Sequence, residues 1–595
     1  MNNELFIIKR DGIHQPFDPQ KIKDAVLKAF KEVDGEITPY AREKAENIAN
    51  YIRGYMEGIP NELTINDIQS LVEHGLMSSK RKDVATAYIE YRHDRDQVRK
   101  WNNHMMDVIK EKLQASNVQN QNANVDEHSF GGRKGEADAV LMKEFALDNC
   151  MSEKSRRRHL NNEIYIHDLD NYAIGSHNCL SIPFDDLLAN GFDTRQGDVR
   201  PAQSVGTAFQ LIAVIFQLQS LQQFGGVSAT HIDWTMVPYV RRSFRKHYID
   251  GLIYIEDIND NDLFNHIPGD AGIEDEEYKI YKKVYKYAMD MTIKETQQAV
   301  EGMFHNLNTL QSRSGNQLPF TSINFGTCTL PEGRMVIKTI LEGSIKGIGK
   351  FHKTPIFPCS IFQLGKGINR KPGDPNYDLY QLALKSTAKR LYPNYANLDW
   401  SGNAGYDINN PSTYFSTMGC RTANGFDING FGQLKDGRGN ICPVTIILPT
   451  IAMEAKEIAE DRYDPPIFEH QYIDQFFELL DEAIHDAKDM LIERFEYICS
   501  QDSSSAKFMY ENNVMAGYIP EEGIRSALKH GTLALGQIGL AETLQILIGK
   551  DHTTEEGMKL AKQIEQLFKN RCAKFKEKYK LNFGVYMTPK FLWAA

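Results

Sequence analysis

The run CPVTIILPTIAMEAKEIAE, residues 442–460, decides the fold class of this chain. Its first half is apolar and rich in β-branched residues, which is typical of a buried strand that ends at Leu448. A helix is expected to begin around Pro449, because proline is favoured in a first helical turn. The run FTSINFG, residues 320–326, is a second short strand-like segment. Helices that alternate with short buried strands predict an α/β architecture whose strand ends can carry a functional site.

The start of this predicted helix is a candidate anion site. Backbone N–H groups in a first helical turn bind anions without any charged side chain. The candidate residues are Pro449, Thr450, Ile451 and Ala452, and Thr450 adds a hydroxyl group. Because α/β proteins in general contain such turns, the turn by itself is also consistent with a structural role.

The composition describes a globular chain and excludes several classes of protein. The 595 residues are 41% hydrophobic and 25% charged, and the formal net charge of -11 argues against a nucleic-acid partner, which requires a basic face. No run approaches the roughly 18 apolar residues of a membrane span, and the N-terminus lacks a signal-peptide core. The sequence therefore predicts a cytoplasmic protein without a membrane partner.

Two isolated cysteines are the most informative single residues. Cys359 lies in the apolar run KTPIFPCSIFQLG, and Cys179 lies in GSHNCLSIPF. The chain has eight cysteines, and their spacing fits neither a disulfide framework nor a zinc site, so we expect reduced thiols and no metal site. Two such thiols are either buried apolar side chains or two parts of a redox site.

The N-terminal residues 1–95 are expected to form a separate unit. A short strand, LFIIKRDG, precedes a helix that Asp18 can cap and that Pro19 can begin. Residues 96–135 become rich in Asn, Gln and Gly toward their end and are expected to be a linker. The remaining residues, 136–595, are expected to form one α/β domain.

The stretch IIKRDGIHQPFDPQKIKDAVLKAF, residues 7–30, resembles the ATP cone, a small helical regulatory domain of ribonucleotide reductases. The signature falls on Lys9, Arg10, Asp11, Gly12, Phe17 and Lys21, and the resemblance continues through VATAYIEYRHDR (84–95). A basic pair beside a glycine turn supplies cations and N–H groups for phosphates, and Lys21 lies near a helix start. The resemblance implies allosteric binding of ATP or dATP.

The rest of the chain resembles the anaerobic, class III ribonucleoside-triphosphate reductases. The resemblance rests on several segments in fixed order: the two cysteine runs, SRSGNQLPFTSINFGT (312–327), STMGCRT (416–422) and HGTLALGQIGLAETL (530–544). It implies a ten-stranded α/β barrel of the ribonucleotide reductase and glycyl-radical type, with an N-terminal ATP-cone domain.

The resemblance also implies the chemistry and the roles of the candidate residues. Cys359 is expected to form the thiyl radical that removes the hydrogen at C3′ of the ribose, and Cys179, on a facing strand, to deliver hydrogen to C2′. Asn178 is expected to bind ribose hydroxyl groups. Residues 449–452 are expected to bind the substrate triphosphate. Formate is the expected reductant.

Further partners follow from the same resemblance. We expect dNTP effectors that choose the substrate, and a homodimer whose interface includes helices within residues 206–233. We also expect an activating enzyme that uses an iron–sulfur cluster and S-adenosylmethionine. Cys420 is expected to be structural, although its distance from the substrate is worth testing.

Two family features are not found in this sequence. The chain contains neither the Arg-x-Cys-Gly-Tyr motif of the glycyl radical nor a C-x2-C pair of the family's zinc site. The expectation is therefore that the chain lacks a C-terminal glycyl-radical region, is inactive by itself, and requires that region as a continuation or as a separate C-terminal fragment.

Three other interpretations remain open. The first is a catalytically inactive remnant that still binds nucleotides. The second is a cobalamin-dependent or diiron reductase, for which a C-terminal cysteine pair is expected. The third is another glycyl-radical enzyme related to formate lyases, which has no reason to carry an ATP cone.

Overall fold

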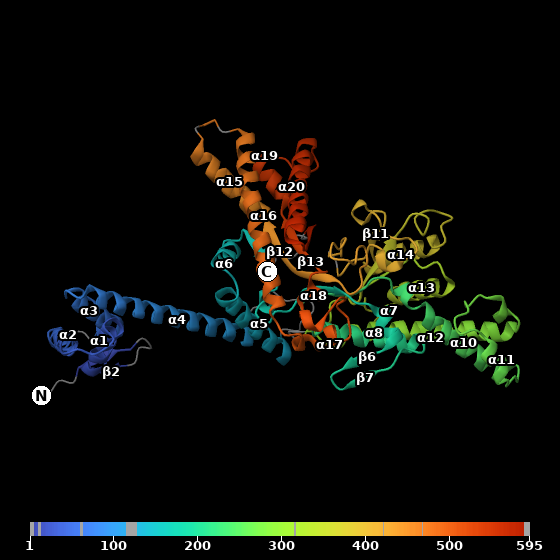
Figure 1. Cartoon of the computed structure of the whole chain (residues 1–595), viewed down its shortest axis with the longest axis horizontal. Coiled ribbons are helices and arrows are strands. Elements are labelled where there is room, and N and C mark those ends of the chain that lie inside the picture. The colour runs from blue at the N-terminus through green and yellow to red at the C-terminus, as the bar shows by residue number, and fades with distance from the viewer. Residues whose placement is uncertain are drawn as a thin grey trace. The chain divides into compact units, whose positions relative to one another are not determined.

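The computed structural model describes residues 5–9, 14–59, 63–114, 128–313, 317–419, 422–463, 465–466 and 468–587. The chain divides into two compact units, Met1–Lys110 and Glu111–Ala595. Figure 1 labels the elements of both units. None of the helices in these described ranges is long and apolar enough to cross a membrane.

The first unit packs helices beside a small sheet. Its strands, in the order β2-β1-β3, are β1 (Phe6–Ile8), β2 (His14–Pro16) and β3 (Leu63–Thr64), and its helices are α1 (Pro19–Asp34), α2 (Pro39–Glu57), α3 (Ile65–Met77) and the start of α4 (Lys82–Gln114). The Asp18 side chain accepts a hydrogen bond from the Gln20 N–H at the start of α1, and Pro19 begins the helix, which confirms both predictions. Within the expected linker, α4 continues to Gln114, residues 115–127 lie outside the described ranges, and α5 begins at Phe130.

The second unit is built on a sheet with nine described strands. The strands are β4 (Ile164–Ile166), β5 (Cys179–Ser181), β8 (Val227–Ala229), β9 (Thr321–Phe325), β10 (Cys359–Leu364), β11 (Asn394–Asn397), β12 (Gly439–Ile447), β13 (Thr532–Ile538) and β14 (Asn582–Met587). Their order is β11-β10-β9-β8-β5-β12-β13-β14, and β4 pairs with β12. The two strands expected from sequence are β12 and β9.

The sheet has two halves that meet between β5 and β12. Strands β5, β8, β9, β10 and β11 run parallel to one another, as do β12, β13 and β14. The two sets join through the antiparallel pairing of β5 with β12. This arrangement confirms the predicted α/β class.

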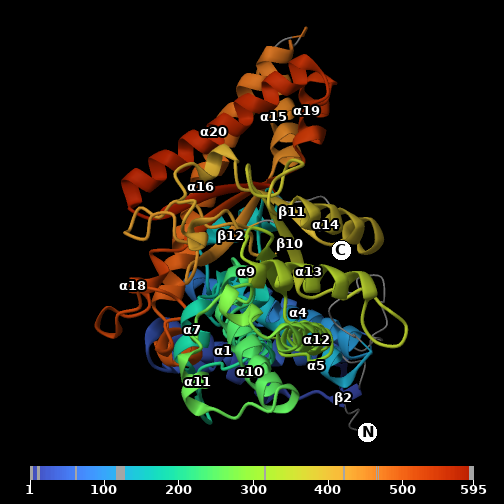
Figure 2. The ribbon, with the colours of Figure 1, turned by 90° about the vertical axis from the view of Figure 1, so that its right-hand side faces the viewer.

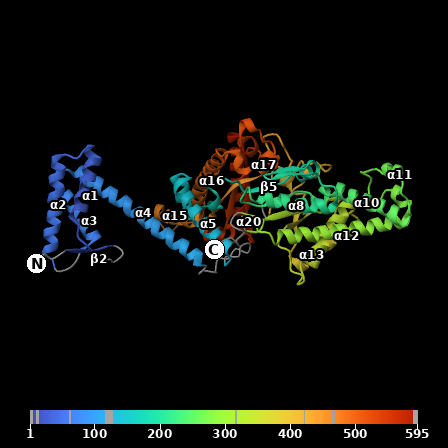
Figure 3. The ribbon, with the colours of Figure 1, turned by 90° about the horizontal axis from the view of Figure 1, so that it is seen from below.

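Helices cover the sheet and connect its strands. They are α5 (Phe130–Asn149), α6 (Glu153–Leu160), α7 (Phe184–Asn190), α8 (Val205–Ser220), α9 (Ile232–Thr235), α10 (Val237–Ile255), α11 (Asn261–His266), α12 (Lys282–Leu307), α13 (Pro331–Lys346), α14 (Tyr377–Arg390), α15 (Leu448–Arg462), α16 (Glu469–Cys499), α17 (Lys507–Glu511), α18 (Arg525–Leu528), α19 (Leu540–Ile548) and α20 (Glu555–Tyr579). A separate hairpin joins β6 (Phe192–Thr194) to β7 (Gly197–Val199). Figure 2 shows α13 and α14 beside β10 and β11, and Figure 3 shows α8 close to α10 and α12.

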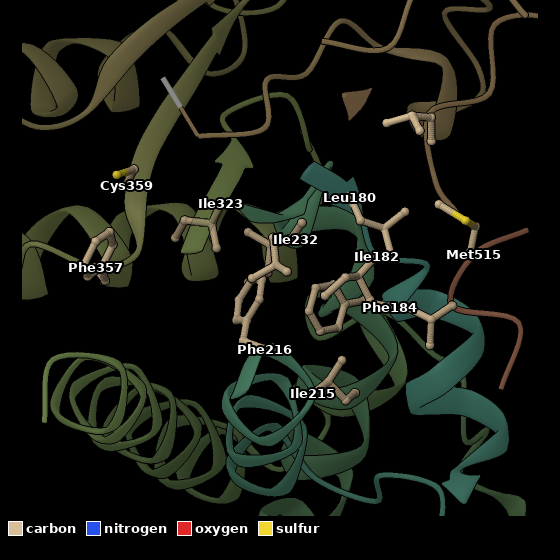
Figure 4. Packing of buried hydrophobic residues seen from close by; sticks show 14 of the residues in the cluster. Leu180, Ile182, Phe184, Ile215, Phe216, Ile232, Ile323, Phe357, Cys359 and Met515 are labelled. Carbon is tan, nitrogen blue, oxygen red and sulfur yellow. The ribbon is translucent and has the colours of Figure 1, made fainter. Parts of the chain in front are cut away.

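The segment 206–233 differs from its expected helical form. It begins as helix α8, which packs against α12, but residues 227–229 are the buried strand β8. Figure 4 shows Phe216 and Ile215 of α8 beneath Leu180 and Ile232, so a large part of the apolar surface of α8 is covered by its own chain.

Candidate active site

Cys179 lies at the start of β5 in a tight, hydrogen-bonded setting. Its side chain is 8% exposed, its thiol donates to Asn178 Oδ1 at 3.3 Å, and the Gly226 N–H donates to Sγ at 3.2 Å. A Cβ on Gly225 would lie 2.0 Å from Asn178 Oδ1, so this close approach requires glycine there. Burial raises the pKa of Cys179 and keeps the sulfur as a thiol, the form that donates a hydrogen atom.

Cys359 begins β10 and is held by an asparagine clamp. The Asn308 amide oxygen accepts the N–H groups of Ile356 at 2.8 Å and Phe357 at 3.0 Å, and its Nδ2 donates to the Phe357 carbonyl. Cys359 is 6% exposed, and its sulfur lies 3.5 Å from the Tyr392 hydroxyl oxygen. The clamp fixes the backbone immediately before the cysteine.

The strand register shows how the two cysteines are related. Cys359 aligns with Ser322, Ser322 with Ser228, and Ser228 with Ser181, which is two residues after Cys179. Because side chains alternate along a strand, all of these residues share one face of the sheet. Both cysteines belong to the same parallel set of strands, and the expectation that they face each other across a barrel stays a prediction. The strands that carry them, β5 and β10, are three strand intervals apart, which is about 14 Å across the sheet at roughly 4.8 Å per interval.

A segment of chain crosses this face between the two cysteines. The Thr417 N–H donates to Asn324 Oδ1 at 3.0 Å, and the Thr417 carbonyl accepts from Asn324 Nδ2 at 3.0 Å and from Ser228 Oγ at 2.9 Å. The Gly419 N–H donates to Ser322 Oγ at 3.0 Å. Strands β8 and β9 therefore anchor residues 417–419 on the face that carries Cys179 and Cys359.

Cys420 and Arg421 lie outside the described residues, whereas Gly419 and Thr422 are described. Thr422 hydrogen-bonds with Met418 through both backbone and side chain. The Thr422 side chain also acts on Cys179 as a hydrogen-bond partner. Gly419 therefore contacts Ser322, and Thr422 reaches Cys179.

The structure adds Asn440, a residue that the sequence analysis did not identify. Asn440 of β12 is the antiparallel register partner of Cys179, so both side chains lie on the same face. It is 2% exposed, and neither its Oδ1 nor its Nδ2 has a partner within the described part of the chain. An unpaired buried amide costs stability, so its presence beside a thiol indicates a place for a polar ligand. The sequence signal was a lone polar residue at the start of an apolar run.

The predicted anion turn lies at the other end of β12. Helix α15 starts at Leu448 with Pro449 in its first turn, and no side chain caps it, so its first N–H groups are available to an anion. Eight residues at roughly 3.3 Å each place this turn about 26 Å from Asn440. That span is longer than an extended triphosphate. The expectation that residues 449–452 bind the substrate triphosphate stays a prediction.

A buried imidazole lies on the same half of the sheet. His231 Nε2 is 3.1 Å from Asp185 Oδ2, and its Nδ1 is 2.6 Å from Thr230 Oγ1. Burial disfavours the charged imidazolium, but Asp436, Asp185 and Asp233 outweigh this and raise the pKa of His231 to about 9. The group is therefore an ion cluster that stabilises the fold at neutral pH.

The N-terminal candidates are only partly described. Lys9 follows β1, and Lys21 is an exposed residue in the first turn of α1, while Arg10, Asp11 and Gly12 lie outside the described residues. In the described ranges, no group of three or more His, Cys, Asp or Glu side chains could hold a metal ion.

An α/β sheet with a buried thiol at the start of a central strand, and a separate N-terminal helical unit, are the features that the resemblance to ribonucleotide reductases leads us to expect. The chain belongs to the anaerobic ribonucleoside-triphosphate reductase family, whose sequence model matches residues 121–590, and it carries an ATP cone domain at residues 5–97. The family resemblance inferred from sequence is thereby confirmed.

Two curated relatives and two solved structures illustrate the similarity. The anaerobic ribonucleoside-triphosphate reductases of Haemophilus influenzae and Escherichia coli are each 30% identical to this chain, over 98% of this chain and 76% of their own length. The Thermotoga maritima anaerobic ribonucleotide reductase with dATP bound in its specificity site superposes with a TM-score of 0.54 and 14% identity, over 81% of this chain and 72% of that one. The same enzyme in complex with dATP and CTP gives a TM-score of 0.52 at the same identity and coverage. The two structures support the fold.

Proposed function

We propose that this chain reduces ribonucleoside triphosphates to 2′-deoxyribonucleoside triphosphates anaerobically, with formate as reductant. The observation that carries the proposal is the buried Cys179 thiol beside the Asn440 amide of the antiparallel strand, an amide that has no partner among the residues that the structure describes. The reaction balances as NTP + HCOO⁻ + H⁺ → dNTP + CO2 + H2O. Cys179 is the hydrogen donor to C2′, and Asn440 with Asn178 binds the ribose hydroxyl groups.

Two cysteines compete for the role of abstracting the C3′ hydrogen. Cys359 is the candidate from sequence and lies on the same face as Cys179, but two strands lie between them. Cys420 is the other candidate, because Gly419 donates to Ser322 and the Thr422 side chain hydrogen-bonds with Cys179. The thiyl radical forms when a glycyl radical on a C-terminal region takes the hydrogen atom of the thiol. An activating enzyme that uses an iron–sulfur cluster and S-adenosylmethionine generates this glycyl radical. We propose that this region also holds the zinc site of the family.

Regulation and assembly complete the proposal. Residues 1–95 bind ATP or dATP as the allosteric cone, followed by a connecting segment to residue 135 and the catalytic domain. The protein works as a cytoplasmic homodimer in which dNTP effectors select the substrate. Helix α8 is the proposed interface helix, although only the side chains that its own chain leaves uncovered are available for it.

The test is anaerobic turnover with the activating enzyme, S-adenosylmethionine, CTP and formate, with and without a polypeptide carrying the glycyl-radical region. Deoxynucleotide formation that requires formate is expected. Cys179→Ala is expected to abolish this turnover. Of the variants Cys359→Ala and Cys420→Ala, the one that also abolishes turnover identifies the cysteine that carries the radical. Turnover that survives all three substitutions, or that runs on dithiols without formate, contradicts the proposal. Nucleotide binding without turnover in every arm favours the remnant.

A further inference from the structure

A guanidinium group near the candidate active site forms no ion pair with any carboxylate that the structure describes. Arg313 Nη1 donates to Gln317 Oε1 at 2.8 Å, and Nη2 donates to the Phe224 carbonyl. Both acceptors are neutral, and within the part of the chain that the structure describes Arg313 forms no ion pair. Asp168 and Asp170 act on it only through space. A guanidinium group has five N–H donors, so most of its capacity is left for another acceptor.

A short series of hydrogen bonds connects Arg313 to Cys179. Phe224, whose carbonyl accepts from Arg313, donates its own N–H to the His177 carbonyl at 3.1 Å. The next residue, Gly225, donates to the Asn178 carbonyl at 3.0 Å, and Gly226 donates to Cys179 Sγ at 3.2 Å. The residue that Arg313 holds is therefore two positions from the one that contacts the sulfur. The positive charge of Arg313 also acts directly on Cys179.

A second guanidinium group increases the positive charge at this place. Arg494 is buried, lies over the ring of Phe224 at 4.8 Å, and donates to the carbonyls of His167 and Asp168. Its Nε is buried and has no partner among the described residues. Asp168 and Asp170 act through space on both guanidinium groups, but neither group forms an ion pair within the described part of the chain, so each keeps donors for an anionic ligand.

From this arrangement we infer that Arg313 anchors an oxyanion beside Cys179. The inference rests on the proposed function, which brings two such groups to the site: the carboxylate of formate and a phosphate of the nucleotide. A carboxylate or phosphate accepts two parallel N–H bonds from one guanidinium group, which fits the free donors of Arg313. The Asn440 amide and the Cys179 thiol then lie on the side where the ligand reacts.

The experiment measures binding to the full chain and needs no radical. Saturation-transfer NMR follows the formate proton, and calorimetry follows CTP, in the wild type and in Arg313→Gln, Arg313→Lys and Cys179→Ser. Arg245→Gln is the matched control, because Arg245 also donates to two carbonyl groups and lies on α10. Loss of charge-assisted hydrogen bonds predicts binding about 10- to 100-fold weaker in Arg313→Gln, with partial recovery in Arg313→Lys.

The outcomes separate the two oxyanions and separate this inference from the proposed function. Weaker formate binding in Arg313→Gln alone assigns the carboxylate, and weaker CTP binding alone assigns the phosphate. Unchanged affinity for both ligands, or an equal loss in Arg245→Gln, overturns the inference. If the wild type shows formate-dependent turnover but the Arg313 variants bind formate and CTP normally, the proposed function stands and only this site is removed. If binding depends on Arg313 but turnover does not depend on formate, this site stands and the proposed function fails.

Discussion

Asn324 provides the most direct test of how the candidate active site is held together. Its buried amide makes two hydrogen bonds of 3.0 Å with Thr417, and its Nδ2 also donates to the Ala229 carbonyl at 3.0 Å. In Asn324→Ala the two bonds to Thr417 are lost, each worth about 1 kcal/mol, and the Thr417 N–H is left unpaired, which costs about 1 kcal/mol more. The segment 417–419 should therefore lose about 3 kcal/mol of local stability.

The assay is hydrogen exchange of the peptide that contains residues 415–419. A loss of about 3 kcal/mol corresponds to about 100-fold faster exchange, since roughly 1.4 kcal/mol is a factor of ten. Asn369→Ala is the control, because this buried amide bonds to Gly326, Gln363 and Gly365 and makes no bond to the segment. Exchange that rises less than about fivefold, or rises equally in both variants, refutes the assigned anchoring role.

Three further predictions concern separate parts of the molecule. Asn440→Ala should leave the denaturation midpoint unchanged, because its side chain forms no hydrogen bond within the described ranges, while weakening CTP binding; a destabilised variant with normal binding contradicts this. The raised pKa of His231 means that its charge stabilises the fold fully below pH 6.5 and that this stabilisation is lost as the pH rises through about 9. The difference in unfolding free energy between wild type and His231→Gln should shrink across that range, and a constant difference refutes the charged imidazole. Lys9→Ala and Lys21→Ala should each weaken ATP binding about tenfold in calorimetry, and unchanged affinity removes them from the cone site.

Local signals predicted much of the fold. Asp18 and Pro19 begin α1 as expected, since capping depends on residues that are neighbours in sequence. Pro449 lies in the first turn of α15, and β12 occupies the apolar run before it. Such features need no knowledge of the rest of the chain.

The composition of the site could not be predicted in the same way, because it depends on strand pairing between distant segments. That Cys359 and Cys179 share a face follows only from the chain of register partners through Ser322 and Ser228. The unpaired amide of Asn440 becomes informative only when β12 is known to run antiparallel to β5. A register shift between Asn440 and Cys442 also breaks the alternation that sequence reading assumes.

The length of β12 has a consequence for where a substrate can bind. Asn440 lies at one end of the strand beside Cys179, and the anion turn at Pro449 lies at the other, about 26 Å away at roughly 3.3 Å per residue. The proposed role of Arg313 gives a nucleotide with its sugar at Cys179 an oxyanion-binding group near the first end. Arg313 is a cation at that end, because its partner Phe224 is bonded to the chain just before Cys179. If CTP binding instead depends on Thr450 and not on Arg313, the sugar cannot lie at Cys179, and the assignment of Cys179 as hydrogen donor fails with it.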